Sequence, residues 1–257
     1  MKRKVLTAVA AVALLAVFLV SLVNVLRARQ RYSEADDLYT DLQERYVETV
    51  ATQPTAVPES SAASEPQEPT PTAPIRVDFA ALREECADVV GWLYCPGTPI
   101  NYPVVQGETN EQYLRRDLSG NYLFSGTLFV DFRCAAPAAG ENYILYGHNM
   151  DDGSMFGSLP EYGEQRYYDA HPLLYYLTPD GCFMIELSAG AVIDADDPIY
   201  TPHPADASID TIRYSSRFLS EVELTSADAV FTLSTCSHEY DGARFVLLGK
   251  ATRLGAS

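Results

Sequence analysis

Apolar and polar residues divide the chain into a helical N-terminal part and a strand-rich C-terminal part. From Val5 to Leu26 no residue is charged, and the run is interrupted only by Thr7, Ser21 and Asn24. As a helix, these 22 residues would be about 33 Å long, enough to cross a hydrocarbon core of about 30 Å. A cleavable signal peptide is the alternative, but its apolar core is usually only about 7–15 residues long. The length therefore favours an uncleaved membrane anchor within residues 1–31.

A second helical pattern follows this apolar run. Leu38, Leu42, Tyr46 and Val50 recur every four residues among charged neighbours, which is the spacing of an amphipathic helix. The stripe continues for fewer than three heptads, which is too short for a dimerising coiled coil. We therefore expect residues 32–51 to form a juxtamembrane stalk helix.

Residues 52–74 have a different composition, dominated by Pro, Thr, Ser, Ala and Glu. Such a segment cannot form a core and favours extended, polyproline-like conformers. At about 3.1 Å per residue, its 23 residues would reach roughly 70 Å. This composition predicts a linker that holds the following domain away from a bilayer surface.

Residues 75–257 predict one mainly β domain, because short β-type runs alternate there with turn signals. Eight runs have strand character: Gly91–Tyr94, Ile100–Val105, Thr127–Phe132, Tyr143–Tyr146, Leu173–Leu177, Phe183–Ile193, Ala229–Thr235 and Arg244–Lys250. Pro96–Pro99 and Thr178–Gly181 indicate turns. Asp78–Ala87 predicts a short helix capped by its first residue, and Ala207–Leu219 has the spacing of another helix. Eight strands in one domain require a closed or sandwiched sheet.

The charge distribution limits the possible functions. The chain carries 18 Lys+Arg and 35 Asp+Glu, and six of the basic residues lie in the first 31, which contain no acid. Binding of nucleic-acid phosphates requires clustered Lys and Arg, so the acidic remainder is not a nucleic-acid-binding domain. Three basic residues precede the apolar run and three follow it, so the positive-inside rule does not decide its orientation. No His pair has metal-ligand spacing, and no metal or cofactor is expected.

One of the five cysteines is positioned as a nucleophile. The odd number leaves at least one thiol unpaired within the chain. Four of them lack CxxC spacing and are expected to be small buried side chains: Cys86, Cys95, Cys134 and Cys182. Cys236 instead ends the strand-like run Ala229–Thr235 and precedes an irregular segment. In an antiparallel hairpin, Arg244 would lie opposite Cys236 with Cβ atoms about 5 Å apart, where its charge stabilises a thiolate.

A Cys nucleophile also needs a proton-transfer partner, which is most often a histidine. His148 follows the apolar run Tyr143–Tyr146 at the point where a strand meets a polar loop, a common position for functional residues. We interpret the other three histidines, His171, His203 and His238, as solvated loop residues. The residues alone therefore favour a site formed by Cys236, His148 and Arg244, although single Cys and His residues also occur in many inert proteins.

These residues lie in motifs that resemble those of class B sortases, the membrane-anchored cysteine transpeptidases of Gram-positive bacteria. The motifs are YGHNMxxGSMF at 146–156, TLSTC at 232–236 and DGARFV at 241–246. Segments 77–79, 91–94, 96–106 and 175–181 are similar to that class in order and spacing. The resemblance covers about residues 75 to 251.

The resemblance implies a closed eight-stranded β-barrel with peripheral helices, in which the helix predicted at Ala207–Leu219 is an insertion of this class. It also implies a single-pass protein of the cell membrane with the N-terminus inside and the catalytic domain outside. The implied partners are secreted proteins with a C-terminal sorting signal and an amine of a peptidoglycan precursor or cross-bridge.

The resemblance also implies roles for individual residues. Cys236 would attack the carbonyl of a Thr–Gly or Thr–Asn bond and form a thioacyl enzyme. His148 would protonate the departing amine and deprotonate the incoming one, and Arg244 would stabilise the oxyanion. The positions that resemble substrate contacts are Asn110, Leu114, Ser234, Thr235 and Ile199.

Three alternatives remain at the level of sequence. A hydrolytic cysteine peptidase would use the same nucleophile with water as the acceptor. A pilin-polymerising sortase is a second alternative, although residues 52–74 lack the Asp-aromatic lid motif expected of that class. In a non-enzymatic surface-binding module, the TLSTC strand would be ordinary core and Cys236 would be unreactive.

Overall fold

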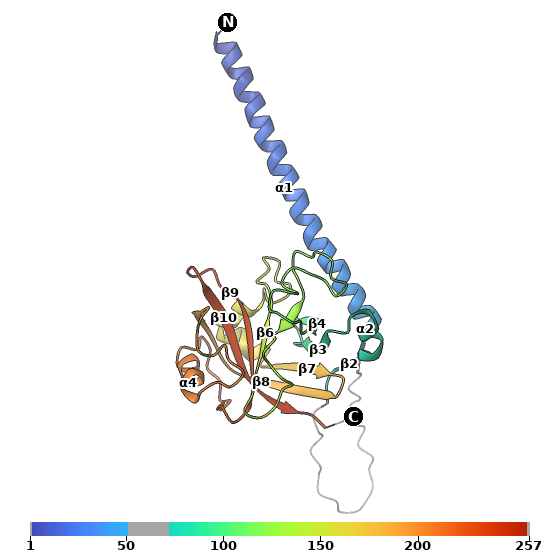
Figure 1. Ribbon diagram of the computed structural model, residues 1–257. Coiled ribbons are helices and arrows are strands. Elements are labelled where there is room, and N and C mark those ends of the chain that lie inside the picture. The colour runs from blue at the N-terminus through green and yellow to red at the C-terminus, as the bar shows by residue number, and fades with distance from the viewer. Residues whose placement is uncertain (1, 51–71, 256–257) are drawn as a thin grey trace, which may run out of the picture.

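Eight strands close into a barrel that forms the C-terminal part of the molecule (Figure 1). The computed structural model describes residues 2–50 and 72–255. The strands pair in the order β10-β8-β7-β3-β4-β5-β6-β9, and β10 closes the ring on β9. Their bounds are β3 Val89–Tyr94, β4 Asn101–Val105, β5 Leu128–Val130, β6 Asn142–Tyr146, β7 Leu173–Thr178, β8 Gly181–Asp194, β9 Ala229–Cys236 and β10 Ala243–Arg253. The predicted set of eight strands and the closed barrel are confirmed.

Large aromatic side chains fill the barrel. Tyr176 and Phe231 are completely buried, and the hydroxyls of Tyr176 and Tyr143 lie 3.0 Å apart, so the polar ends of these two rings satisfy each other. Gly91 makes this packing possible, because a Cβ at that position would lie 2.3 Å from the Tyr176 ring. The same core supports the strand ends that carry the candidate site.

The predicted turns and helices are present with adjusted ends. Residues 96–99 connect β3 to β4, and Thr178–Gly181 connects β7 to β8. Helix α2 (Phe79–Glu85) is capped by Asp78, whose carboxylate accepts from the Ala81 N–H at 3.0 Å. The sequence did not predict two further short helices, η1 (Leu159–Gly163) and α3 (Gln165–Ala170).

Helix α4 (Asp206–Tyr214) is shorter than the helix predicted at Ala207–Leu219. Ser215 is its C-cap: the Ser215 N–H still donates to the Thr211 carbonyl at 3.2 Å, the Ser215 hydroxyl donates to the same carbonyl at 3.0 Å, and the next N–H, of Ser216, bonds only three residues back, to Arg213. The chain then turns so that Phe218 is buried, with 3% of its surface exposed. The predicted helix at this position is therefore confirmed, and its C-terminal boundary is corrected.

The N-terminal residues form one continuous helix, α1 (Lys2–Tyr46), which extends away from the barrel (Figure 1). Within the described part of the chain, no helix is long and apolar enough to span a membrane. The predicted span Val5–Leu26 falls partly on residues 5–13, whose side chains lie outside the described part.

The end of the predicted juxtamembrane helix is corrected by the structure. Residues 47–49, expected to be helical, form strand β1 (Val47–Thr49), which pairs antiparallel with β2 (Ile75–Val77). This pairing joins segments that are far apart in the sequence, so local helical spacing did not indicate it. The Val50 N–H also donates to the Pro74 carbonyl at 2.9 Å.

The second half of α1 packs against the barrel. Its buried stripe consists of Ala35, Tyr39, Leu42 and Tyr46, each with 6% or less of its surface exposed. Tyr39 donates its hydroxyl to the Gly126 carbonyl, a bond that fixes the helix on the loop before β5. The amphipathic pattern therefore marks a face docked on the domain and not a free stalk.

The docking of α1 bears on what the Pro-rich segment connects. The predicted linker, residues 52–74, lies mostly outside the described residues. The chain on either side of it belongs to one body, because β1 pairs with β2 and α1 packs on the barrel. The segment thus joins two hydrogen-bonded strands and does not separate α1 from the domain.

Candidate active site

Two parallel strands bring His148 and Cys236 to the same end of the barrel. β6 and β9 are parallel neighbours, with Tyr146 opposite Ser234. His148 follows Tyr146, the last residue of β6, by two positions, and Cys236 follows Ser234 by two positions and ends β9, so both lie at the same edge of the sheet. Asn149 fixes the two chain ends together, because its Nδ2 donates to the Cys236 carbonyl at 2.8 Å.

The hairpin predicted between the last two strands is confirmed. β9 and β10 are antiparallel, and Arg244 is the direct partner of Cys236 in the register. The Arg244 guanidinium donates through Nη1 to the carbonyls of Gly242 and Ala243, at 3.2 and 3.0 Å. These bonds hold the guanidinium near the start of β10, the point at which Cys236 is its partner in the register.

A cleft of about 650 Å³ contains these three residues. Of the eight residues selected from the sequence, seven line it: Cys236, His148, Arg244, Asn110, Leu114, Ser234 and Thr235. Ile199 does not line the cleft, because its side chain is completely buried in a second apolar cluster. Its neighbour Tyr200 lines the cleft instead, and the Tyr200 hydroxyl lies 2.8 Å from Ser234 Oγ.

The environment of His148 defines its tautomer and favours its neutral form. Nε2 lies 2.7 Å from the Leu114 carbonyl oxygen, which can only accept, so Nε2 carries a proton and donates it to this bond. In the neutral ring, Nδ1 therefore keeps its lone pair. Burial lowers the pKa of His148 from 6.5, the Leu114 bond opposes this, and the Arg115 charge lowers it further. A neutral imidazole is thus available as a base near neutral pH.

All five cysteines of the chain lie in the described residues, and none of them forms a disulfide. Cys236 is the exposed one. Cys86, Cys95 and Cys134 are buried, as the sequence predicted, and Cys182 is partly buried. Burial raises the pKa of the Cys95 thiol and raises those of Cys134 and Cys182 to about 11. These raised pKa values make Cys95, Cys134 and Cys182 poor nucleophiles at neutral pH, and Cys86 is inaccessible because it is buried, which leaves Cys236 as the reactive candidate.

The remaining histidines lie outside the cleft. His203 is largely exposed, with Nδ1 3.4 Å from a Glu141 carboxylate oxygen, and His238 is exposed. His171 differs from its interpretation as a solvated residue, because it is half-buried with Nδ1 3.0 Å from the Pro96 carbonyl. In the described part of the chain, no three His, Cys, Asp or Glu side chains converge as metal ligands.

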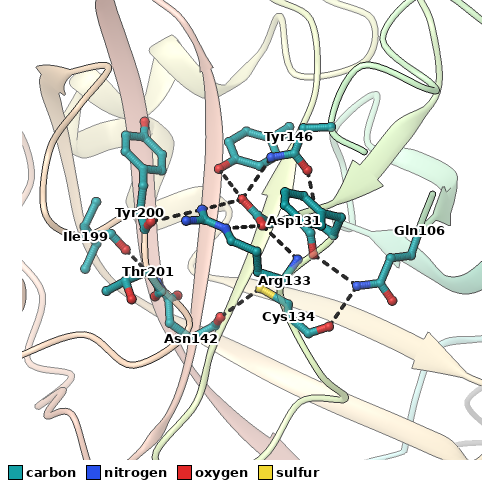
Figure 2. Close-up of polar contacts among 11 residues, drawn as sticks. Gln106, Asp131, Arg133, Cys134, Asn142, Tyr146, Ile199, Tyr200 and Thr201 are labelled. Carbon is teal, nitrogen blue, oxygen red and sulfur yellow. Dashed lines mark hydrogen bonds and ion pairs between the residues drawn. The ribbon is translucent and has the colours of Figure 1, made fainter. Parts of the chain in front are cut away.

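The other wall of the cleft is formed by side chains that the sequence did not predict as a group. Arg133, Tyr146 and Tyr200 line the cleft, and Figure 2 shows them around Asp131, which is fully buried. Burial raises the pKa of Asp131, but hydrogen bonds from Arg133, Asn110 and Tyr146 outweigh this and lower it to about 2. The available signal was a carboxylate and a guanidinium two residues apart at the end of a strand.

Comparisons with known proteins agree with this geometry. No protein-family model matches the chain. Sortase B of Staphylococcus aureus strain NCTC 8325 is 33% identical over 187 residues, which cover 70% of this chain and 77% of that protein. Sortase B of Listeria monocytogenes serovar 1/2a is 32% identical over 185 residues, which cover 68% of this chain and 74% of that protein.

Solved structures show the same fold. A Staphylococcus aureus sortase B–substrate complex matches with a TM-score of 0.63 and 32% identity, over 69% of this chain and 85% of that one. A sortase B complexed with triglycine matches with a TM-score of 0.64 and 29% identity, over 69% and 86%. Two relatives above 30% identity, the barrel and the Cys-containing cleft lead to one conclusion. The chain belongs to the sortase B family of cysteine transpeptidases.

Proposed function

We propose that this transpeptidase cleaves the C-terminal sorting signal of secreted proteins and transfers them to a cell-wall amine, with Cys236 as the nucleophile. The observation that carries the proposal is the convergence of one exposed thiol, one cleft histidine and Arg244 at a single barrel end. The related structures with a substrate and with triglycine support a peptide donor and an amine acceptor.

In the first half-reaction, the Cys236 thiol loses its proton to His148 Nδ1, and the thiolate attacks the carbonyl carbon of the scissile bond. Arg244 donates to the oxyanion that forms. The imidazolium then returns the proton to the departing amine, and the C–N bond breaks to leave a thioester on Cys236. The lowered pKa of His148 suits it for this proton donation.

In the second half-reaction, the acceptor amine attacks the thioester carbonyl. His148, again neutral, removes a proton from the amine as the C–N bond forms, and Arg244 again stabilises the oxyanion. The C–S bond breaks, and the proton passes from His148 to the Cys236 thiolate. Because each residue returns to its starting state, the enzyme can turn over.

The proposed peptide-binding surface is the cleft outside this triad. Asn110 and Leu114 are its accessible side chains, whereas Ser234 and Thr235 line it with only 2% of their surface exposed. Ile199 supports the cleft indirectly: its buried side chain fixes the position of the backbone next to Tyr200, which lines the cleft. We assign these residues to substrate contact or its support.

The membrane anchor at Val5–Leu26 is part of the proposal. It is supported by the uncharged run and by exposed apolar side chains of α1, which include Leu14, Phe18 and Leu26 at 71%, 61% and 55% exposure. Residues 1–4 then lie inside the cell, and residues 75–257, with the docked part of α1, lie outside. This orientation places the cleft where secreted proteins and cell-wall amines are found.

The test is product analysis with the full-length protein in detergent micelles. Peptides with a Thr–Gly or Thr–Asn bond are incubated with triglycine, and the products are identified by mass spectrometry. We expect the wild type and Cys182→Ala to form the triglycine adduct, and Cys236→Ala to form none. A triglycine adduct made by Cys236→Ala would refute the proposed nucleophile. Hydrolysis alone, with no adduct at saturating triglycine, would favour a hydrolytic peptidase.

A further inference from the structure

Asp131 is a buried carboxylate on which three side chains of the cleft converge (Figure 2). All three partners, Asn110, Arg133 and Tyr146, line the cleft. Asn110 Nδ2 and the Tyr146 hydroxyl each donate to Asp131 Oδ2 at 3.0 Å. Arg133 donates through Nε to Oδ1 and through Nη2 to Oδ2, both at 2.8 Å. One carboxylate thus fixes three side chains of the same wall.

The hydrogen bonds continue to the opposite side of this wall (Figure 2). Arg133 Nη2 also donates to the Tyr200 carbonyl at 3.1 Å, and the Tyr200 hydroxyl reaches Ser234 Oγ at 2.8 Å. Asn142 Nδ2 donates to the carbonyls on either side of Tyr200, at 2.9 and 3.1 Å. The Tyr200 ring stacks on Tyr146 with centroids 6.1 Å apart. The segment around Tyr200 is therefore held by two side chains, Arg133 and Asn142. Of these two, Arg133 is fixed in place by Asp131.

The groups at the reacting end are held by other bonds. His148 donates to the Leu114 carbonyl, and Arg244 donates to the carbonyls at the start of β10. The Cys236 carbonyl accepts from Asn149. Within the described residues, none of these bonds involves Asp131. The network therefore orders the peptide-binding wall and does not hold the triad.

The geometry points to Asp131 as a positioning residue for peptide binding, which preorganises Asn110, Arg133 and Tyr146 to receive the sorting-signal peptide. This inference rests on the proposed function. A buried carboxylate keeps its donors in one arrangement, because any donor that leaves exposes an unpaired charge to a low-dielectric interior. Its low pKa keeps Asp131 charged throughout the physiological range. The peptide thus meets side chains that are already ordered, so the free energy of binding is not reduced by the entropy cost of ordering them.

The test is Asp131→Asn in the full-length protein in micelles, with a Thr–Asn peptide as donor and triglycine as acceptor. The amide keeps the size of the side chain and removes the charge that three donors share. We expect KM for the peptide to rise about 10–100-fold, the loss typical of hydrogen bonds to a charged group, while kcat falls much less. Asp228→Asn is the matched control, because Asp228 pairs with Lys250 at 2.8 Å outside the cleft and should leave KM unchanged.

A second variant covers the case in which Asp131→Asn does not fold. Tyr146→Phe keeps the ring and the carboxylate and removes one donor, so we expect a smaller KM increase of about 2–10-fold. If the wild type is active and KM is unchanged in the folded variants, or kcat alone falls, the role of Asp131 is overturned. If the wild type makes no triglycine adduct with any peptide, the proposed function fails first.

Discussion

The docking of α1 on the barrel predicts that a leucine far from the catalytic domain in sequence stabilises that domain. Leu42 has 2% of its surface exposed and belongs to the same apolar cluster as Trp92. Replacing a buried leucine with alanine typically costs about 2–5 kcal/mol, because the transfer free energy is lost and a cavity is left. We therefore expect Leu42→Ala to reduce the free energy of unfolding of the barrel domain by that amount.

The fluorescence of Trp92 measures this effect. It is the single tryptophan of the chain, is fully buried in β3, and donates Nε1 to Asn101 Oδ1 at 2.7 Å. Gln43 of α1 donates to the Asn101 carbonyl at 2.8 Å, so the reporter lies next to the docked helix. For a domain of this size, 2–5 kcal/mol corresponds to a decrease in Tm of roughly 4–20 °C.

Leu219→Ala is the matched control for this measurement. It removes the same atoms from a leucine that is 84% exposed, so a change within about 0.5 kcal/mol is expected. If α1 were a stalk independent of the domain, Leu42→Ala would behave like this control. Equal urea midpoints for the two variants in full-length protein would therefore refute the docking argument.

Three further predictions concern the site and the chain around it. Arg244→Lys should lower kcat about 10²–10³-fold, because an ammonium cannot replace the guanidinium fork; near wild-type turnover in a triglycine transfer assay would contradict this. Because burial lowers the pKa of His148, the unfolded chain binds the proton more readily, so the free energy of unfolding should decrease as pH falls below 6.5. His148→Gln should lose this part of the pH dependence, as measured by urea unfolding between about pH 7.5 and pH 5. A specific protease site placed within residues 51–71 should be cut without releasing the domain from membranes until urea is added, since β1–β2 pairing and α1 docking remain; immediate release would contradict this.

Short-range patterns predicted the barrel well. The eight strands were predictable because β-branched and aromatic residues concentrate there and turn residues separate them. The elements that were missed are short or depend on distant partners. α3 has six residues and buries none of them, so it has no apolar periodicity to detect, and β1 has three residues whose partner follows the Pro-rich segment.

In the candidate site, too, residues placed by local sequence were predictable and residues placed by distant contacts were not. Cys236 and Arg244 were predictable because a hairpin places residues near in sequence opposite each other, and His148 because it ends a strand. The second wall was not predictable, because Arg133 meets the Tyr200 carbonyl across 67 residues of sequence. Ile199 shows the same limit, since whether a residue or its neighbour faces a cleft depends on loop geometry.

The position of α1 also changes how this enzyme would meet its substrates. Tyr32 already contacts Phe124 edge-on, with ring centroids 6.0 Å apart. Tyr32 lies six residues after Leu26, the end of the proposed span, which is about 9 Å along a helix. In Figure 1, β10 begins at the end of the barrel toward which α1 extends. If the proposed span lies in the bilayer, the docked helix holds this end of the barrel close to the membrane, in place of the reach of roughly 70 Å that an extended linker would give.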